Sequence, residues 1–210
     1  MNLNSDGAKV TRKEREFQAR RREIMNAATR LFAEKGYHGT AMSEIAKEAE
    51  FSTGSLYNFF QNKEELYFTL LLEKIDALEA EVMAVTASPG DVEEKLERLI
   101  DTIFSFFIRE RDFWRIFAEQ QSAFESGSKG RFAGAVHDKY LRYIANMVAL
   151  MDEGKEKGLF KDLGPEELAL NFFGILNTYL FIFVNSAEKY DLNQKKKVVM
   201  EIFFDGARKR

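Results

Sequence analysis

Five of the seven residues between positions 52 and 58 carry a hydroxyl or amide group, and Gly54 among them carries no side chain. Such groups donate and accept hydrogen bonds to phosphate oxygens and to the edges of nucleic-acid bases. At the start of a short helix they can reach into a DNA major groove, and a glycine there allows close approach. Each hydroxyl could equally cap a helix, so both interpretations stay open for the individual side chains.

Two short helices joined by a tight turn are expected to position these groups. The apolar face of the first is formed by Ile45, Ala46 and Ala49, and that of the second by Leu56, Phe59 and Phe60. Phe51 falls between them and can fill the small core. Helices this short bury little surface alone, so a third helix must cover them. This arrangement is that of a helix-turn-helix.

Residues 22–66 contain four segments in order: I-M-N-A-A-T-R-L-F-A-E-K-G-Y-H-G-T, S-E-I-A, S-T-G-S-L-Y-N-F-F and N-K-E-E-L. Their content and spacing resemble the DNA-binding domain of the TetR family of transcriptional regulators. The resemblance implies that Tyr57 and Lys63 contact DNA phosphates. The predicted DNA-contacting residues together are Arg20, Arg21, Arg22, Thr40, Ser43, Ser52, Thr53, Gly54, Ser55, Tyr57, Asn58 and Lys63.

Glu50 departs from the family pattern, which has glycine at this turn position. If the backbone keeps a left-handed conformation there, a glutamate costs about 1 kcal/mol relative to glycine. Its negative charge also lies close to the predicted DNA-contacting surface. A helical, dimeric small-molecule-binding protein whose DNA-binding head has lapsed is therefore the alternative hypothesis.

Charge is distributed unevenly along the chain. Residues 1–22 contain seven Lys and Arg against three Asp and Glu, or +4, which leaves −7 for the rest of a chain whose net charge is −3. A basic arm on an acidic body suits a protein that contacts phosphate with one end only. We expect residues 1–10 to be a disordered tail and Arg12 to Arg22 to contribute to DNA binding.

The remaining pattern predicts an all-α protein of about nine helices. A helix from about Thr11 to Lys35 ends at Gly36, Thr40 or a neighbour caps the next, and Ser52 and Asn62 cap the two that follow. The helix that begins at Asn62 continues to the Ser88-Pro89-Gly90 break. We expect residues 11–66 to form the DNA-binding domain and residues 67–210 to form a helical ligand-binding and dimerisation domain.

The segment Phe172 to Val184 is apolar nearly all the way round. Such a helix must be buried on every side or lie in a membrane. A span needs about 20 apolar residues, and Asn171 and Asn185 bracket this run, so no membrane contact is expected. Burial against a second subunit is the prediction, with a fully buried monomeric core helix as the alternative. The resemblance implies a homodimer formed through the last two helices.

Most of the 20 phenylalanines lie after residue 100. Aromatic walls with a few polar groups are typical of small-molecule pockets, although each ring could simply fill the core. The predicted ligand-binding residues are Phe104, Phe107, Trp114, Phe117, Gln121, Tyr143, Met147, Phe173 and Asn177. We expect a largely apolar or aromatic effector that shifts the protein away from its DNA-binding arrangement on an inverted-repeat operator. The resemblance implies that the protein is a repressor and that this ligand relieves the repression.

An enzyme is not expected. The sequence contains two widely separated histidines, no cysteine, no nucleophile elbow and no phosphate-binding loop. No cofactor or metal is predicted. The N-terminus is polar and charged and lacks the apolar core of a signal peptide, so a cytoplasmic protein is expected.

Overall fold

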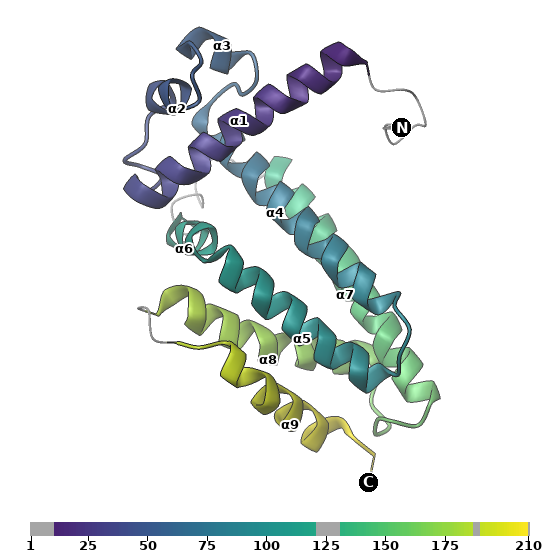
Figure 1. Cartoon of the computed structure of the whole chain (residues 1–210). Coiled ribbons are helices and arrows are strands. Elements are labelled where there is room, and N and C mark those ends of the chain that lie inside the picture. Colours follow the sequence, from purple (N-terminus) through teal and green to yellow (C-terminus); the bar gives the residue numbers. More distant parts are fainter. Residues whose placement is uncertain (1–10, 121–130, 187–189, 210) are drawn as a thin grey trace. The chain divides into compact units, whose positions relative to one another are not determined.

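The computed structural model describes residues 11–120, 131–186 and 190–209, without the side chains at 116, 117, 119, 120 and 131–133. The described ranges are helical, with no β-strand, which confirms the predicted fold class (Figure 1). The α-helices are α1 (Arg12–Lys35), α2 (Met42–Glu48), α3 (Thr53–Tyr57), α4 (Lys63–Thr86), α5 (Val92–Arg109), α6 (Arg111–Gln120), α7 (Arg131–Glu156), α8 (Pro165–Asn185) and α9 (Lys196–Ala207). A 3₁₀ turn, η2 (Asn193–Lys195), precedes α9.

The chain divides into two compact units, and the boundary between Leu71 and Leu72 falls inside α4. In the first unit, α1 packs across α2, and α2 packs against α3. Ile24, Ala28 and Leu31 form the buried face of α1, at the predicted helical spacing. Ile45 and Leu56 complete this small core from α2 and α3.

Helix ends in the first unit follow local hydrogen bonding. Ser52 caps α3, and the Asn62 side chain accepts a bond from the Glu65 amide at 2.8 Å, as predicted. Thr11, near which the first helix was expected to begin, caps α1. The cap of α2 is Ala41 instead of Thr40, because the Glu44 carboxylate accepts the Ala41 amide at 2.9 Å. Thr40 has a different role, described below.

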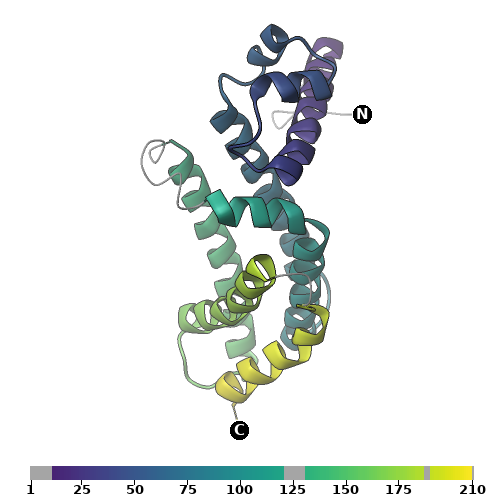
Figure 2. The same ribbon diagram turned by 90° about the vertical axis from the view of Figure 1, so that its left-hand side faces the viewer.

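In the second unit, α8 packs against α6, α7 and α9, while α5 contacts α6, α7, α8 and α9 (Figures 1 and 2). Pro165 opens α8 in the first turn, as predicted. The inner side of α8 is buried through Phe172, Leu176, Leu180 and Phe183.

Helix α8 is longer than its apolar run indicated. It contains 21 residues with a mean hydropathy of 1.6 in its most apolar window, so among the described helices it alone could cross a membrane by length and composition. The sequence argument that it is too short was therefore wrong. Length and composition are weak evidence for a span, because the core helix of a soluble protein can share them, and α8 packs against four other helices.

Glu50 has a φ of 61° and is the one non-glycine residue with positive φ in the described ranges. The strained turn predicted from the family pattern is therefore confirmed. Its amide donates to the Lys47 carbonyl at 3.1 Å, and the next amide, of Phe51, donates to the Ala46 carbonyl at 2.8 Å. These bonds hold the turn that joins α2 to α3.

We expect Glu50→Gly to raise the free energy of unfolding by about 1 kcal/mol, because glycine adopts positive φ without a Cβ clash. Thermal or urea denaturation of the full chain measures the change. Glu50→Ala is the matched control, since it removes the charge and keeps the Cβ. Equal stabilisation by both substitutions would assign the cost to the charge instead of the backbone.

Candidate nucleic-acid interface and ligand cavity

The start of α3 presents a row of polar groups on an exposed surface. Ser52 Oγ accepts the Ser55 amide at 3.1 Å and lies 2.8 Å from Ser55 Oγ. Thr53 and Asn58 are exposed, and Tyr57 is 49% exposed, while Leu56 faces the core. The Ser52 hydroxyl therefore caps α3, and Thr53, Tyr57 and Asn58 are the side chains that an approaching DNA major groove would meet first.

Gly54 lies between these side chains. A Cβ at Gly54 would meet no other atom of the protein within 4 Å, and its φ does not lie in the left-handed region. Neither packing nor backbone geometry therefore requires glycine. The open space is consistent with close approach of another molecule to this turn of α3.

Thr40 lies in the loop before α2 and is 2% exposed. Its hydroxyl donates to the carbonyls of Gly36 at 2.8 Å and Leu31 at 3.2 Å. The phosphate contact predicted for the Thr40 side chain is therefore wrong, because a buried hydroxyl fixes the loop and cannot reach DNA. Ser43, the second residue of α2, is exposed and keeps that prediction.

Lys63, the first residue of α4, points toward the same loop. Its ammonium donates to the carbonyls of Tyr37 at 2.7 Å and Thr40 at 2.8 Å, and lies 4.4 Å from the Tyr37 ring centroid. Partial burial lowers the pKa of Lys63. Lys63 therefore ties α4 to the loop between α1 and α2, and two of its three N–H groups are used in that role.

The first turns of α1 carry an apolar side chain, Phe17, that contacts the residues after α3 although it is 43% exposed. Phe17, two turns before Ile24, stacks on Phe59 with ring centroids 4.7 Å apart. The Arg21 guanidinium lies 5.1 Å from the Phe60 ring centroid. Arg20 and Arg22 are exposed. Aromatic contacts therefore hold the basic end of α1 beside the residues that follow α3.

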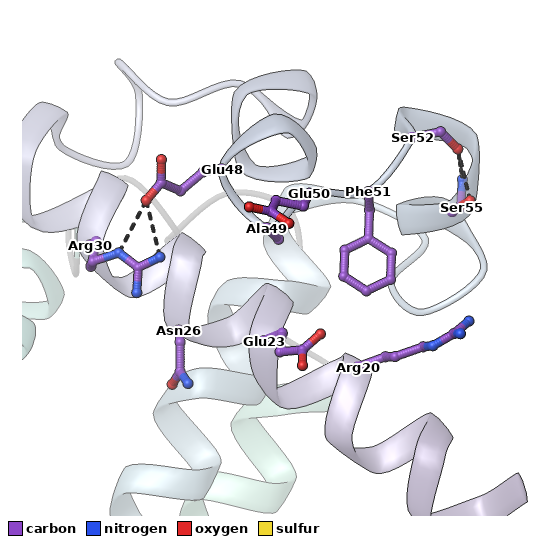
Figure 3. Close-up of a pocket in the computed structure, with 10 residues that line it drawn as sticks. All are labelled: Arg20, Glu23, Asn26, Arg30, Glu48, Ala49, Glu50, Phe51, Ser52 and Ser55. Carbon is purple, nitrogen blue, oxygen red and sulfur yellow. Dashed lines mark hydrogen bonds and ion pairs between the residues drawn. The ribbon is translucent and has the colours of Figure 1, made fainter.

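A polar groove of about 670 Å³ lies between α1 and the turn that joins α2 to α3 (Figure 3). Arg20 and Glu23 project into it from α1, while Glu50, Phe51 and Ser52 line it from the turn. Arg30 bonds the Glu48 carboxylate at 3.0 and 3.2 Å. The lining residues include three carboxylates and two guanidinium groups, so the net charge of the groove does not favour phosphate binding.

A second, mostly apolar cavity of about 200 Å³ lies within the second unit. Four predicted ligand-binding residues line it: Phe107, Tyr143, Phe173 and Asn177. Trp114 stacks on Phe107 with centroids 4.6 Å apart and so supports the wall from behind. Phe104 and Met147 are buried but do not line this cavity. The Phe117 side chain and Gln121 lie outside the described part of the structure.

Sequence reasoning missed the contributions of α4 and of the first half of α7. Ile75, Leu78 and Glu79 line the cavity from one face of α4, and Lys139 and Tyr140 line it from α7. The spacing of the three α4 residues, i, i+3 and i+4, could have indicated a shared face. The charged residues Glu79 and Lys139 could not be assigned to the cavity from sequence, because their ion-pair partners lie about 60 residues away.

Two ion pairs join α4 to α7 at this cavity. Lys139 pairs with Asp76, and Arg142 bonds Glu79 at 2.9 and 3.2 Å. The Arg142 hydrogen bonds lower the pKa of Glu79. Burial raises the pKa of the Tyr143 phenol, so this hydroxyl stays protonated at neutral pH.

Comparison with known proteins agrees with this architecture. Residues 24–70 match the model of bacterial regulatory proteins of the tetR family, and residues 89–180 match the tetracyclin repressor-like C-terminal domain. The HTH-type transcriptional repressor KstR2 of Mycobacterium tuberculosis is 30% identical over 146 residues, covering 70% of this chain and 72% of that protein. The chain belongs to the TetR family. It is a DNA-binding, ligand-responsive transcriptional regulator.

One curated relative and one solved structure carry names that refer to fatty acid metabolism or a fatty acyl ligand. The fatty acid metabolism regulator protein of Bacillus subtilis is 26% identical over 187 residues, covering 88% of this chain and 93% of that protein. The crystal structure of the transcriptional regulator FadR from Bacillus subtilis in complex with stearoyl-CoA shares the fold, with a TM-score of 0.74 and 24% identity, covering 88% of this chain and 98% of that one.

We expect Tyr57→Phe to weaken DNA binding at least tenfold, since a hydrogen bond to a charged phosphate contributes about 1.5 to 3 kcal/mol. The exposed hydroxyl has no structural role in the described part of the chain, so thermal stability is expected to stay unchanged. Fluorescence anisotropy with a DNA fragment selected by the wild-type protein measures the affinity. Tyr190→Phe, a loop variant of the second unit, is the control, and equal affinities for both variants would exclude the Tyr57 contact.

Phe17→Ala is expected to weaken DNA binding and to flatten its salt dependence, because the basic end of α1 is no longer attached to Phe59. The slope of log affinity against log salt falls by about 0.9 for each phosphate that the protein no longer neutralises. Phe17→Tyr keeps the ring stack and serves as the matched control. A wild-type slope for Phe17→Ala would show that this end of α1 does not bind DNA.

Proposed function

We propose that the protein is a homodimeric, cytoplasmic repressor that binds an inverted-repeat operator and releases it when a largely apolar effector fills the cavity of the second unit. The observation that carries this proposal is that residues of α4 contact both the loop before the helix-turn-helix and the cavity. Its first residue, Lys63, bonds the loop before the helix-turn-helix, and Ile75, Leu78 and Glu79 farther along line the cavity. A ligand that favours one arrangement of α4 therefore biases the DNA-binding unit.

The proposed DNA contacts divide into two groups. Thr53, Gly54 and Asn58 approach base edges at the start of α3, where short polar groups give modest base selectivity. Ser55 belongs with this base-contacting group. The phosphate contacts are proposed for Arg20, Arg21, Arg22, Ser43, Ser52, Tyr57 and Lys63. Lys63 has one N–H group left for this purpose and acts mainly by holding the loop.

Dimerisation is proposed through the outward side of α8 together with α9. Leu170 is 51% exposed, Phe181 is 69% exposed and Ile182 is 38% exposed along α8, and Ile202 is 49% exposed on α9. Large exposed apolar side chains at this spacing are typical of an interaction surface. An interface that pairs two copies of the same helices satisfies twofold symmetry, which an inverted-repeat operator requires.

The apolar lining of the cavity supports an effector with an aliphatic or aromatic body. Ligand pockets for drug-sized molecules are commonly about 300 to 1,000 Å³, and this cavity of about 200 Å³ is smaller. The relatives named for fatty acid metabolism support a fatty acyl compound, of which the cavity as it stands would take only a short segment.

A lapsed DNA-binding head is the second candidate, and the strained, negatively charged Glu50 favours it. One experiment distinguishes the two proposals. The purified protein is mixed with sheared genomic DNA of its source and with competitor DNA at near-physiological salt, and bound fragments are sequenced. Enrichment of a few fragments that share an inverted repeat supports the regulator, whereas a folded, ligand-free dimer that enriches none supports the lapsed head.

We expect Phe181→Glu to convert the dimer to a monomer, because a carboxylate at the centre of an apolar interface would be buried without a partner. Sedimentation equilibrium measures the mass. Leu141→Glu places the same change on an exposed apolar residue of α7 and is expected to leave the dimer intact. A dimeric Phe181→Glu protein would rule out this side of α8 as the interface.

A further inference from the structure

We propose that the effector carries an anionic head group and that Lys139 recognises this group by exchanging Asp76 for it. The inference rests on the proposed ligand-binding role of the cavity in the second unit. It adds the chemical class of the ligand and the ion pair through which the ligand acts on α4.

The two ion pairs between α4 and α7 place opposite charges in the cavity wall. The Lys139 side chain is 13% exposed and its partner Asp76 is 54% exposed. The Glu79 side chain is 17% exposed and its partner Arg142 is 56% exposed. Each pair therefore has an inner member that lines the cavity and an outer member that faces solvent.

The two inner charges differ in how fully they are satisfied. Both Glu79 oxygens accept bonds from the Arg142 guanidinium. Lys139 has three N–H groups, and among the described residues Asp76 is the one carboxylate that pairs with it. Glu79 also interacts electrostatically with Lys139, but no second carboxylate among the described residues bonds the ammonium. The cavity therefore keeps N–H groups for a negatively charged ligand, while both oxygens of its carboxylate already accept bonds.

The other polar groups of the cavity can also act as donors. Two asparagines of α8 outside the cavity serve as a comparison: the side chains of Asn171 and Asn185 each donate to the carbonyl four residues earlier, at 2.7 and 2.8 Å. Asn177, on the same helix, makes no such bond in the described part of the chain, and neither does the Tyr143 hydroxyl. An ammonium, an amide and a phenol on one cavity match the acceptor oxygens of a carboxylate or phosphate.

The exchange at Lys139 would act directly on α4. Asp76 and Glu79 are three residues apart on α4, and Lys139 and Arg142 are three residues apart on α7, so the two pairs join one face of each helix. An anion that takes Lys139 removes one of the two ties and leaves the Glu79–Arg142 tie in place. A neutral ligand fills the cavity without removing either.

Decanoate and decan-1-ol test this inference, because they share one chain and differ in the charge of the head. Isothermal titration calorimetry with the full-length protein is expected to show at least tenfold tighter binding of decanoate. Lys139→Met keeps the length and apolar stem of the side chain, and is expected to abolish the preference while decan-1-ol binds as before. Lys155→Gln, whose ion pair with Asp162 lies outside the cavity, is the control.

Asp76→Asn provides a second, independent variant, since the exposed carboxylate that competes with the ligand is removed. It is expected to bind decanoate several-fold more tightly than the wild-type protein and decan-1-ol equally. Decanoyl-CoA distinguishes the source of the charge. If the protein binds it more tightly than decanoate and decan-1-ol, and Lys139→Met abolishes this preference, the recognised anion is a phosphate of the coenzyme A moiety.

Three results would overturn the inference. Equal binding of decanoate and decan-1-ol to the wild-type protein, or a full decanoate preference in Lys139→Met, would remove Lys139 as the recognition group and leave the apolar cavity in place. Failure of all three ligands to bind the wild-type protein would contradict the proposed fatty acyl effector as well.

Discussion

The hydrogen bonds from Lys63 to the carbonyls of Tyr37 and Thr40 are the interaction on which the regulatory account depends. They attach the start of α4 to the loop between α1 and α2, and Thr40 in turn bonds the end of α1. From Leu72 onward α4 belongs to the second unit, where Ile75, Leu78 and Glu79 line the cavity, so we propose that this one helix takes part in both functions. Ring contacts of Tyr67 with Phe32 and Tyr37 support the same attachment, so loss of the Lys63 bonds would weaken, rather than remove, the proposed restraint on the DNA-binding unit.

The first unit was largely predictable because its structure is determined by neighbours in sequence. The predicted caps at Ser52 and Asn62 and the apolar spacing of α1 each involve residues within one or two helical turns. The strained backbone at Glu50 followed from the resemblance, since a family glycine marks a position that needs positive φ. Local rules failed at Thr40, whose hydroxyl turns inward to carbonyls four and nine residues earlier.

The second unit was less predictable because its site is assembled from distant segments. Aromatic content indicated Phe107, Tyr143 and Phe173 as cavity residues, but the same criterion selected Phe104, which lies in the core. The ion pairs between α4 and α7 join residues 63 positions apart, and no local pattern marks Asp76 or Lys139 as members of a site. The length of α8 was also underestimated from its apolar run, because the helix begins with a polar first turn before that run.

The central claim is that DNA and effector compete through one helix, and linkage tests it most directly. The affinity of the protein for a selected operator fragment is measured with and without saturating decanoate, and its affinity for decanoate is measured with and without saturating operator. The account predicts that each ligand weakens the other by the same factor, as reciprocity requires. Decanoate affinity that is identical for the free and the operator-bound protein would contradict it.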